Sequence, residues 1–203
     1  MIVHSFRTTV LAVILAIGMS AGSARADGVD AAIGFIQKLG DKAVSTIAAT
    51  EKDEDERLRQ FRGLLNENFD VPGIGRFVLG RYWRVATPEQ RDEYLKLFEE
   101  SIIRTYARRF SDYSGETVEV ERARRDGDDF ILVDSRIQRP TGGPVAVTWR
   151  LLGEGESFKI VDVVVEGVSM SVTQRSDFAS VIQSGGGNIE ALLKVMRERL
   201  GKA

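Results

Sequence analysis

The side chains that most often carry catalysis are almost missing from this chain. Its 203 residues include a single histidine, His4, and no cysteine. Without cysteine there is no thiolate nucleophile, and His4 is the one imidazole that could shuttle a proton near neutral pH or bind zinc. His4 lies in a leader that we expect to be removed, as argued below. We therefore predict that the working protein is not an enzyme.

Short acidic and glycine-rich runs are the remaining candidates for ligand chemistry. Residues 53–56, Asp-Glu-Asp-Glu, lack the glycine and the spaced ligands of a calcium loop and are typical of a helix N-terminus. Residues 126–129, Asp-Gly-Asp-Asp, are typical of a hairpin turn. The glycines at 185–187 precede no Lys-Ser or Lys-Thr pair, and residues 73–75 follow no strand, so neither run predicts a phosphate-binding loop. We predict no metal ion and no cofactor.

The N-terminal segment has the three-part layout of a secretory signal. Arg7 precedes an apolar run over residues 10–19, and the sequence Ala-Arg-Ala supplies an A-x-A cleavage site before Asp27. The apolar run holds about ten residues, whereas a membrane-spanning helix needs about twenty, so cleavage is favoured over anchoring. We predict that residues 1–26 are a cleaved signal peptide and that residues 27–203 form a single exported domain.

Composition and charge are those of an ordinary globular domain. The chain is 43% hydrophobic and 29% charged, with a formal net charge of −2 at pH 7. Removing Arg7 and Arg25 with the leader would change the net charge from −2 to −4. A weakly acidic balance gives no electrostatic reason to expect nucleic acid or an anionic membrane as a standing partner.

Hydrophobic periodicity predicts several helices. Apolar residues at three- and four-residue steps indicate helices over residues 30–50 and 53–69. Residues 87–90, Thr-Pro-Glu-Gln, are typical of a capping box with proline at the first helical position, and they predict a long helix to about Phe110. The face of this helix that we expect to be buried carries Leu95, Phe98, Ile102 and Tyr106.

After Gly115 the apolar period changes from helical spacing to two, which predicts strands. Four strands are expected, near residues 118–121, 131–137, 145–152 and 158–165. Their connections have hairpin length, which favours an antiparallel meander over parallel pairing. A helix over residues 172–183 and a last helix capped by Asn188 follow. We predict an α+β fold in which a curved four-stranded antiparallel sheet packs against several helices, with an apolar cavity between them.

The most unusual stretch is residues 69–84, FDVPGIGRFVLGRYWR, in which aromatic and aliphatic side chains are mixed with glycines and arginines. One interpretation is a short core helix with its arginines on the surface. The other is the wall of an apolar cavity with arginines at its mouth. The same mixture could stack single-stranded RNA, but export disfavours that partner. The residues alone leave the first two interpretations open.

A cavity wall would come from this stretch, from the long helix and from inward-facing strand positions. The helical candidates are Phe77, Val78, Tyr82, Trp83, Phe98, Ile102 and Tyr106. The strand candidates are Ile131, Val133, Val145, Val147, Trp149, Val161, Val163 and Val165, with a parity that a shift of one residue would reverse. The candidates for a lipid headgroup, whose phosphate a guanidinium group can bind bidentately, are Arg76, Arg81 and Arg84.

Two stretches carry a resemblance to a known family. The first comprises Phe69-Asp70, residues 76–83 (RFVLGRYW), 87–90, Phe98, Thr105-Tyr106 and 113–115. The second comprises residues 159–163 (KIVDV), 166–169 (EGVS) and 175–178 (RSDF). In these residues the chain resembles the MlaC family of periplasmic phospholipid carriers, also called toluene-tolerance proteins, and within it the branch associated with hopanoid-producing bacteria.

The resemblance implies a soluble periplasmic shuttle whose acyl-chain pocket lies between the sheet and the helices. It also implies two partners, an outer-membrane lipoprotein complex and an inner-membrane ABC transporter with MCE domains. Two acyl chains carry on the order of 30 methylenes, and at about 0.8 kcal/mol each their exposure to water would cost roughly 24 kcal/mol. A lipid therefore needs a carrier to cross an aqueous compartment. The alternatives are a lipid-free envelope adaptor and a carrier of a hopanoid-type lipid.

Overall fold

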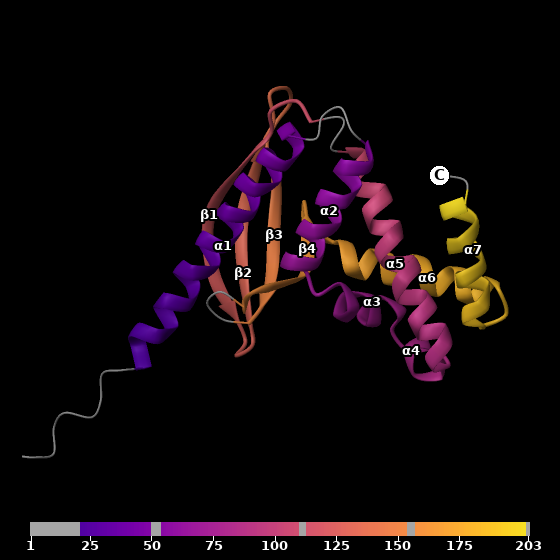
Figure 1. The fold of residues 1–203 in the computed structure, drawn as a ribbon. Coiled ribbons are helices and arrows are strands. Elements are labelled where there is room, and N and C mark those ends of the chain that lie inside the picture. The colour runs from indigo at the N-terminus through magenta and orange to yellow at the C-terminus, as the bar shows by residue number, and fades with distance from the viewer. Residues whose placement is uncertain (1–20, 50–53, 110–112, 154–156, 202–203) are drawn as a thin grey trace, which may run out of the picture.

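The computed structural model describes residues 21–49, 54–109, 113–153 and 157–201, and in these ranges five helices precede an antiparallel sheet and two follow it (Figure 1). The helices are α1 (Ala21–Ala49), α2 (Glu54–Asn68), α3 (Val71–Leu79), α4 (Tyr82–Val85), α5 (Pro88–Arg109), α6 (Met170–Ser184) and α7 (Ile189–Gly201). Among these described helices, none combines the length and the hydropathy that a membrane span needs.

The predicted antiparallel meander is confirmed, but the sheet has five strands and the expectation of four was wrong. The strands are β1 (Thr117–Asp126), β2 (Phe130–Gln138), β3 (Val145–Leu152), β4 (Lys159–Val165) and β5 (Val168–Ser169), hydrogen-bonded in that order. Glu166 and Gly167 have φ angles of 49° and 80°, and two successive positive φ values make a turn that reverses the chain into a neighbouring strand. Glutamate is an unusual residue at positive φ, so residue types alone do not predict this hairpin.

The strand register gives the sheet one apolar face. Val133, Trp149 and Val163 lie directly opposite one another across β2, β3 and β4. We call this the inner face, because α1 lies against it where it continues onto β1. A Cβ atom on Gly40 of α1 would be 3.2 Å from the Cβ of Val118, so glycine permits the helix backbone to approach the strand closely.

The opposite, outer face is charged. Asp134 accepts hydrogen bonds from Arg122 and Arg124 of β1 and, at 2.7 Å, from the hydroxyl of Thr148. Burial by itself would raise the pKa of the Asp134 carboxyl, but these hydrogen bonds outweigh it and the pKa is lowered. The contrast between the two faces fixes which side of the sheet receives the helices.

Buried apolar side chains form two separate groups. The sheet cluster joins α1 to the inner face and consists of Ala32, Ile36, Ile131, Val133, Leu151, Phe158 and Ile160. The helix cluster lies among the helices from α2 through α7. It consists of Leu65, Val71, Val78, Leu79, Tyr82, Ala86, Tyr94, Phe98, Ile103, Phe178, Ile182, Ile189, Leu192, Leu193 and Met196. The domain therefore has a sheet part and a helical part, each with its own interior.

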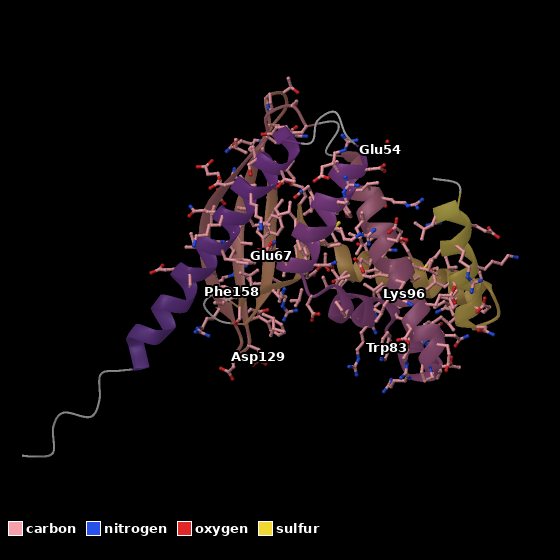
Figure 2. All side chains as sticks on the ribbon, in the orientation of Figure 1. Glu54, Glu67, Trp83, Lys96, Asp129 and Phe158 are labelled. Carbon is pink, nitrogen blue, oxygen red and sulfur yellow. The ribbon has the colours of Figure 1, made fainter. Side chains whose placement is uncertain are left out.

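The segment between α2 and α3 fastens these two parts together. The Phe69 side chain packs against both clusters. The backbone N–H of Asp70 donates to the Ile160 carbonyl at 3.0 Å, and Lys159 Nζ donates to the Glu67 carbonyl at 2.6 Å. Figure 2 shows Glu67 at the end of α2 that lies nearest the sheet. The C-terminus of α2 is thus held on β4 by a cation placed where the helix dipole favours one.

Most predicted helix boundaries are confirmed. The capping box forms, because Thr87 N–H donates to Gln90 Oε1 at 3.1 Å and Gln90 N–H donates to Thr87 Oγ1 at 3.2 Å. The Asn188 side chain caps α7 by accepting from the Glu190 N–H at 2.9 Å. These interactions involve residues two or three positions apart, which is why the sequence alone predicts them.

The buried face of α5 differs from the predicted one. Tyr106 was expected inside, yet 40% of it is exposed, while Tyr94 and Ile103 are fully buried. Tyr94 and Ile103 are nine residues apart and so lie on opposite sides of the helix. Because α5 packs against α2, α3 and α7, it is buried on more than one side, and a single stripe does not describe it.

Helix α1 begins earlier than the predicted residues 30–50. Its first residue is Ala21, so the predicted cleavage site before Asp27 lies inside the helix. Cleavage there stays a prediction. His4 and the apolar run at residues 10–19 lie outside the described residues.

Candidate functional site

The helical candidates for lipid contact lie mostly in the helix cluster. Val78 of α3, Tyr82 of α4 and Phe98 of α5 are buried members of it. Trp83 and Ile102 are partly buried and pack against the same cluster. These five residues thus form much of one apolar interior on the helical side.

The strand candidates lie on the inner face of the sheet. Ile131 and Val133 are buried in the sheet cluster, and Trp149 and Val163 pack against it. Val147, which pairs with Ser135 of β2 and Val165 of β4, is also buried. The predicted parity of β2 and β3 is therefore correct at these positions.

Strand β4 requires one correction of parity. The register shifts between Arg150 and Leu151, so that Leu151 pairs with Ile160 and Val161 has no partner. Ile160, which is fully buried, occupies the inner face where Val161 was expected. A bulge of one extra residue reverses the alternation, and nothing in a run of valines and isoleucine reveals where it falls.

Two inner-face candidates keep partial exposure. Val145 pairs with Ile137, and Val165 pairs with Val147, so both continue the apolar face toward one end of β3 and β4. Neither is fully buried, although both are large aliphatic residues. This end of the inner face is therefore an apolar surface that the protein's own helices cover incompletely.

A pair of polar groups interrupts the inner face and is internally satisfied. Trp149 Nε1 donates to Ser135 Oγ at 2.9 Å, and the Ser135 hydroxyl donates to the Val147 carbonyl at 3.1 Å. Both donors thus have partners inside the protein, so the face needs no water at this point.

The three headgroup candidates lie on the helical side, around α4. Arg76, Arg81 and Arg84 are all exposed. Arg81 Nη2 donates to Tyr82 Oη at 2.9 Å, and this hydrogen bond lowers the pKa of the Tyr82 hydroxyl. The Arg76 guanidinium carbon lies 5.9 Å from the centre of the Trp83 ring. The surface-arginine interpretation of residues 69–84 therefore describes these side chains.

Two more candidates are not in either apolar interior. Phe77 is 44% exposed, with the Arg175 guanidinium 5.1 Å above its ring, and Tyr106 is 40% exposed. The residues proposed as one wall thus fall into a sheet group, a helix group and a surface group. The structure does not bring all of them together.

Sequence reasoning missed residues that complete these groups. Phe69 packs on both clusters, and Phe178 of α6 meets the rings of Tyr94 and Phe98 edge-on at 6.2 and 6.3 Å. Both phenylalanines stand inside the two stretches that carry the family resemblance, which was the available signal. Their exact neighbours depend on contacts between distant segments.

Tyr94 was missed as well. It is fully buried, and its hydroxyl donates to the Gly75 carbonyl at 3.0 Å. Burial raises the pKa of this hydroxyl, so it stays a neutral donor. The described ranges hold no group of three or more His, Cys, Asp or Glu side chains that could surround a metal ion.

Comparison with known proteins identifies the family. The family model described as MlaC protein matches residues 37–198, a range that contains the whole helix cluster and all of the sheet cluster except Ala32 and Ile36. The chain belongs to the MlaC family. The earlier resemblance is thereby confirmed at the level of the family.

Two named relatives match the chain over most of its length. The chain is 28% identical over 172 residues to the "Intermembrane phospholipid transport system binding protein MlaC" of Haemophilus influenzae, which covers 81% of this chain and 79% of that protein. It is 24% identical over 141 residues to the "Toluene tolerance protein ttg2D" of Pseudomonas putida, covering 69% of this chain and 66% of that protein.

A solved structure adds a ligand to this comparison. The phospholipid-binding protein from Ralstonia solanacearum, determined in complex with a phospholipid, matches with a TM-score of 0.67 and 29% sequence identity. The match covers 82% of this chain and 97% of that one. Its name and that of the Haemophilus influenzae relative describe phospholipid binding and transport, and neither describes catalysis.

Proposed function

We propose that this MlaC-family protein is a periplasmic carrier that holds phospholipid acyl chains between the sheet cluster and the helix cluster. The observation that carries this proposal is the match to a structure that was determined with a phospholipid bound. The match extends over nearly all of that chain, so the comparison includes the part that binds the lipid.

The apolar chemistry of this chain supports the same site. Val145 and Val165 leave part of the inner face uncovered, next to Trp149 and Val163, which are also only partly buried. Acyl chains laid along these strands would remove apolar surface from water at about 25 cal/mol per Å². Phe69 packs against both clusters beside Ile160, at the other end of β4 from Val165.

A carrier also has to release its lipid. A site that held acyl chains much more tightly than a bilayer does would stall at unloading, whereas comparable affinities allow exchange in both directions. An imperfectly covered apolar face meets this requirement better than a closely packed one. The carrier would exchange lipid between an outer-membrane lipoprotein complex and an inner-membrane ABC transporter with MCE domains, and it would perform no chemistry on the lipid.

Lipid extraction from the purified protein tests the proposal. We expect denaturing extraction followed by mass spectrometry to release phospholipid in a near-stoichiometric amount. A hopanoid-type lipid in its place would move this chain to the hopanoid-associated branch and change the cargo. Protein free of any lipid after gentle purification would contradict a carrier and favour the lipid-free adaptor.

A matched pair of substitutions locates the site. Val165→Trp places a large ring on the partly uncovered inner face and is expected to reduce co-purified lipid severalfold by occupying its space. Ala146→Trp, on the exposed outer face of the neighbouring strand, adds the same ring and should leave lipid content unchanged. Equal lipid content in both variants would place the acyl chains elsewhere.

A further inference from the structure

Five arginines at the α3–α4 end of the helical part have no acidic partner among the described residues. These residues are Arg76, Arg81, Arg84, Arg91 and Arg175, and within the described residues no carboxylate oxygen lies close enough to form an ion pair with any of them. Most arginines of the sheet, by contrast, are matched with aspartate or glutamate. Residues 71–88 contain three arginines and not one acidic residue, in a chain whose net charge is negative.

Aromatic rings hold three of these arginines in one neighbourhood, and Arg84 directly follows one of those rings in the chain. The guanidinium carbons of Arg76 and Arg91 lie 5.9 and 5.4 Å from the centre of the Trp83 ring. Arg91 also donates to the carbonyls of Trp83 at 2.8 Å and Arg84 at 3.4 Å. Arg81 is held over the Tyr82 ring at 4.9 Å. Figure 2 shows Trp83 at the end of the helical part where α3 and α4 lie.

Helix α6 brings the fifth arginine to the same place. Arg175 lies 5.1 Å from the Phe77 ring, and a Cβ on Gly80 would be 2.9 Å from its Nε. Exposed apolar side chains accompany the charges: Phe77 is 44% exposed, Val85 is 75% exposed, and Val172, one turn before Arg175, is 55% exposed. We call the five arginines with Phe77, Trp83, Val85 and Val172 the arginine face.

We propose that the arginine face docks the protein on the surface of a bilayer that contains anionic phospholipid. Unpaired guanidinium groups bind phosphates through charge-assisted hydrogen bonds, and each basic residue near an anionic surface adds attraction. Exposed phenylalanine and valine side chains and the partly buried Trp83 among them suit the boundary between headgroups and acyl chains. This inference rests on the proposed carrier function, because a carrier has to reach the membranes that supply and receive its lipid.

The composition of this face favours a bilayer over the other anionic partners. A phosphate on the carried lipid would occupy one or two arginines, whereas five of them, spread over helices α3, α4, α5 and α6 and the turn between α3 and α4, suit many phosphates at once. An acidic protein would satisfy the charges but would leave the exposed apolar side chains without a matching environment. Because the chain as a whole is weakly acidic, an anionic bilayer repels the rest of its surface. This favours an orientation in which the arginine face meets the bilayer.

Vesicle sedimentation tests the docking. The protein is purified after export, its N-terminus is verified by mass spectrometry, and it is mixed with vesicles of phosphatidylcholine alone or of equimolar phosphatidylcholine and phosphatidylglycerol. We expect binding to the anionic vesicles only, and weaker binding as sodium chloride screens the charges. No binding by the unmodified protein at low salt would overturn the proposal and favour an acidic protein partner.

Charge removal provides the matched comparison. Arg84→Gln with Arg175→Gln should weaken anionic vesicle binding roughly 30-fold, at about fivefold for each arginine near the surface. Lys38→Gln with Arg199→Gln removes the same charge from exposed positions on α1 and α7 and should leave binding close to that of the unmodified protein. Equal weakening by the two pairs would overturn the proposal. Circular dichroism shows whether each variant is folded. If a variant misfolds, the dependence of vesicle binding by the unmodified protein on lipid composition and on salt still tests the proposal.

Lipid content, measured on the same preparations, separates this inference from the carrier function. Weaker vesicle binding with undiminished co-purified lipid supports docking. Loss of both together would overturn it, because the arginines would then hold the carried lipid. Lipid-free protein that still binds anionic vesicles would contradict the carrier and leave the docking surface standing.

Discussion

Close contact between α3 and α5 depends on a residue without a side chain. Gly75 is buried in α3, and a Cβ at this position would lie 2.9 Å from Leu95 Cδ2 and 3.1 Å from Phe98 Cδ1. The same short distance allows the Tyr94 hydroxyl of α5 to reach the Gly75 carbonyl. One small residue thus sets the spacing of two helices in the helix cluster.

Substituting glycine by alanine should therefore change the free energy of unfolding in opposite directions at two helical positions. Gly75→Ala forces Leu95 and Phe98 apart and is expected to reduce the free energy of unfolding by about 1–3 kcal/mol. Gly63→Ala, in α2 with no atom within 4 Å of the new methyl group, should increase it by up to about 1 kcal/mol. Urea unfolding measures both. Stabilisation by Gly75→Ala would show that the α3–α5 contact is looser than described.

At the scale of elements, Glu100 of α5 links neighbouring helices. Its carboxylate accepts from Arg62 of α2 at 2.6 Å and from Arg104 of its own helix at 2.8 Å. Arg104 also donates to the Leu200 carbonyl of α7 at 2.6 Å. The pKa of Glu100 is lowered below its ordinary 4.5. The largest cause is the hydrogen bond from Arg62, and the next is the hydrogen bond from Arg104. One carboxylate therefore connects α2, α5 and, through Arg104, α7.

This linkage predicts how stability changes with pH. A carboxyl whose pKa is lower in the folded than in the unfolded state contributes stability that is fully present above the unfolded value and is lost as the pH falls through the folded value. We expect the melting temperature to fall below about pH 4.5, and to fall less steeply in Glu100→Gln, which does not titrate. Identical pH profiles for the two proteins would mean that Glu100 contributes nothing to this dependence.

At the scale of the whole molecule, Phe69 lies where the two apolar interiors meet. Phe69 packs against both the sheet cluster and the helix cluster, beside the backbone hydrogen bond from Asp70 to Ile160. The chain has two tryptophans, and each reports on one interior: Trp83 packs against the helix cluster and Trp149 against the sheet cluster. Fluorescence of single-tryptophan proteins can therefore follow each part separately.

Phe69→Ala should uncouple the two parts. In otherwise unmodified Trp83→Phe and Trp149→Phe proteins we expect urea transitions at nearly the same midpoint, because the parts unfold together. Adding Phe69→Ala should cost about 2–3 kcal/mol, less than a fully buried phenylalanine, and should separate the two midpoints. Phe69→Leu, which keeps an apolar contact, is the control. Coincident midpoints in the alanine variants would show that other contacts, such as those of Asp162 with Ser169 and Ser171, are enough to couple the two parts.

Much of the fold and part of the candidate site followed from the sequence by itself. The capping box at residues 87–90, the hairpin turn at 126–129 and the helices and strands around them depend on hydrogen bonds and periodicities that act over a few residues. The parity of β2 and β3 followed from alternation, and the motifs around Phe77 and Val163 were enough to identify the family.

Only the tertiary structure decided which side chains are buried and which of them contact one another. The exposure of Tyr106, the bulge that puts Ile160 in place of Val161, and the split of the candidates into two interiors depend on helices and strands far away in the chain. The unpaired arginines show the same limit. A net charge summed over the sequence is weakly negative, but charges act over about 10 Å in salt solution, so folding determines which of them meet a partner.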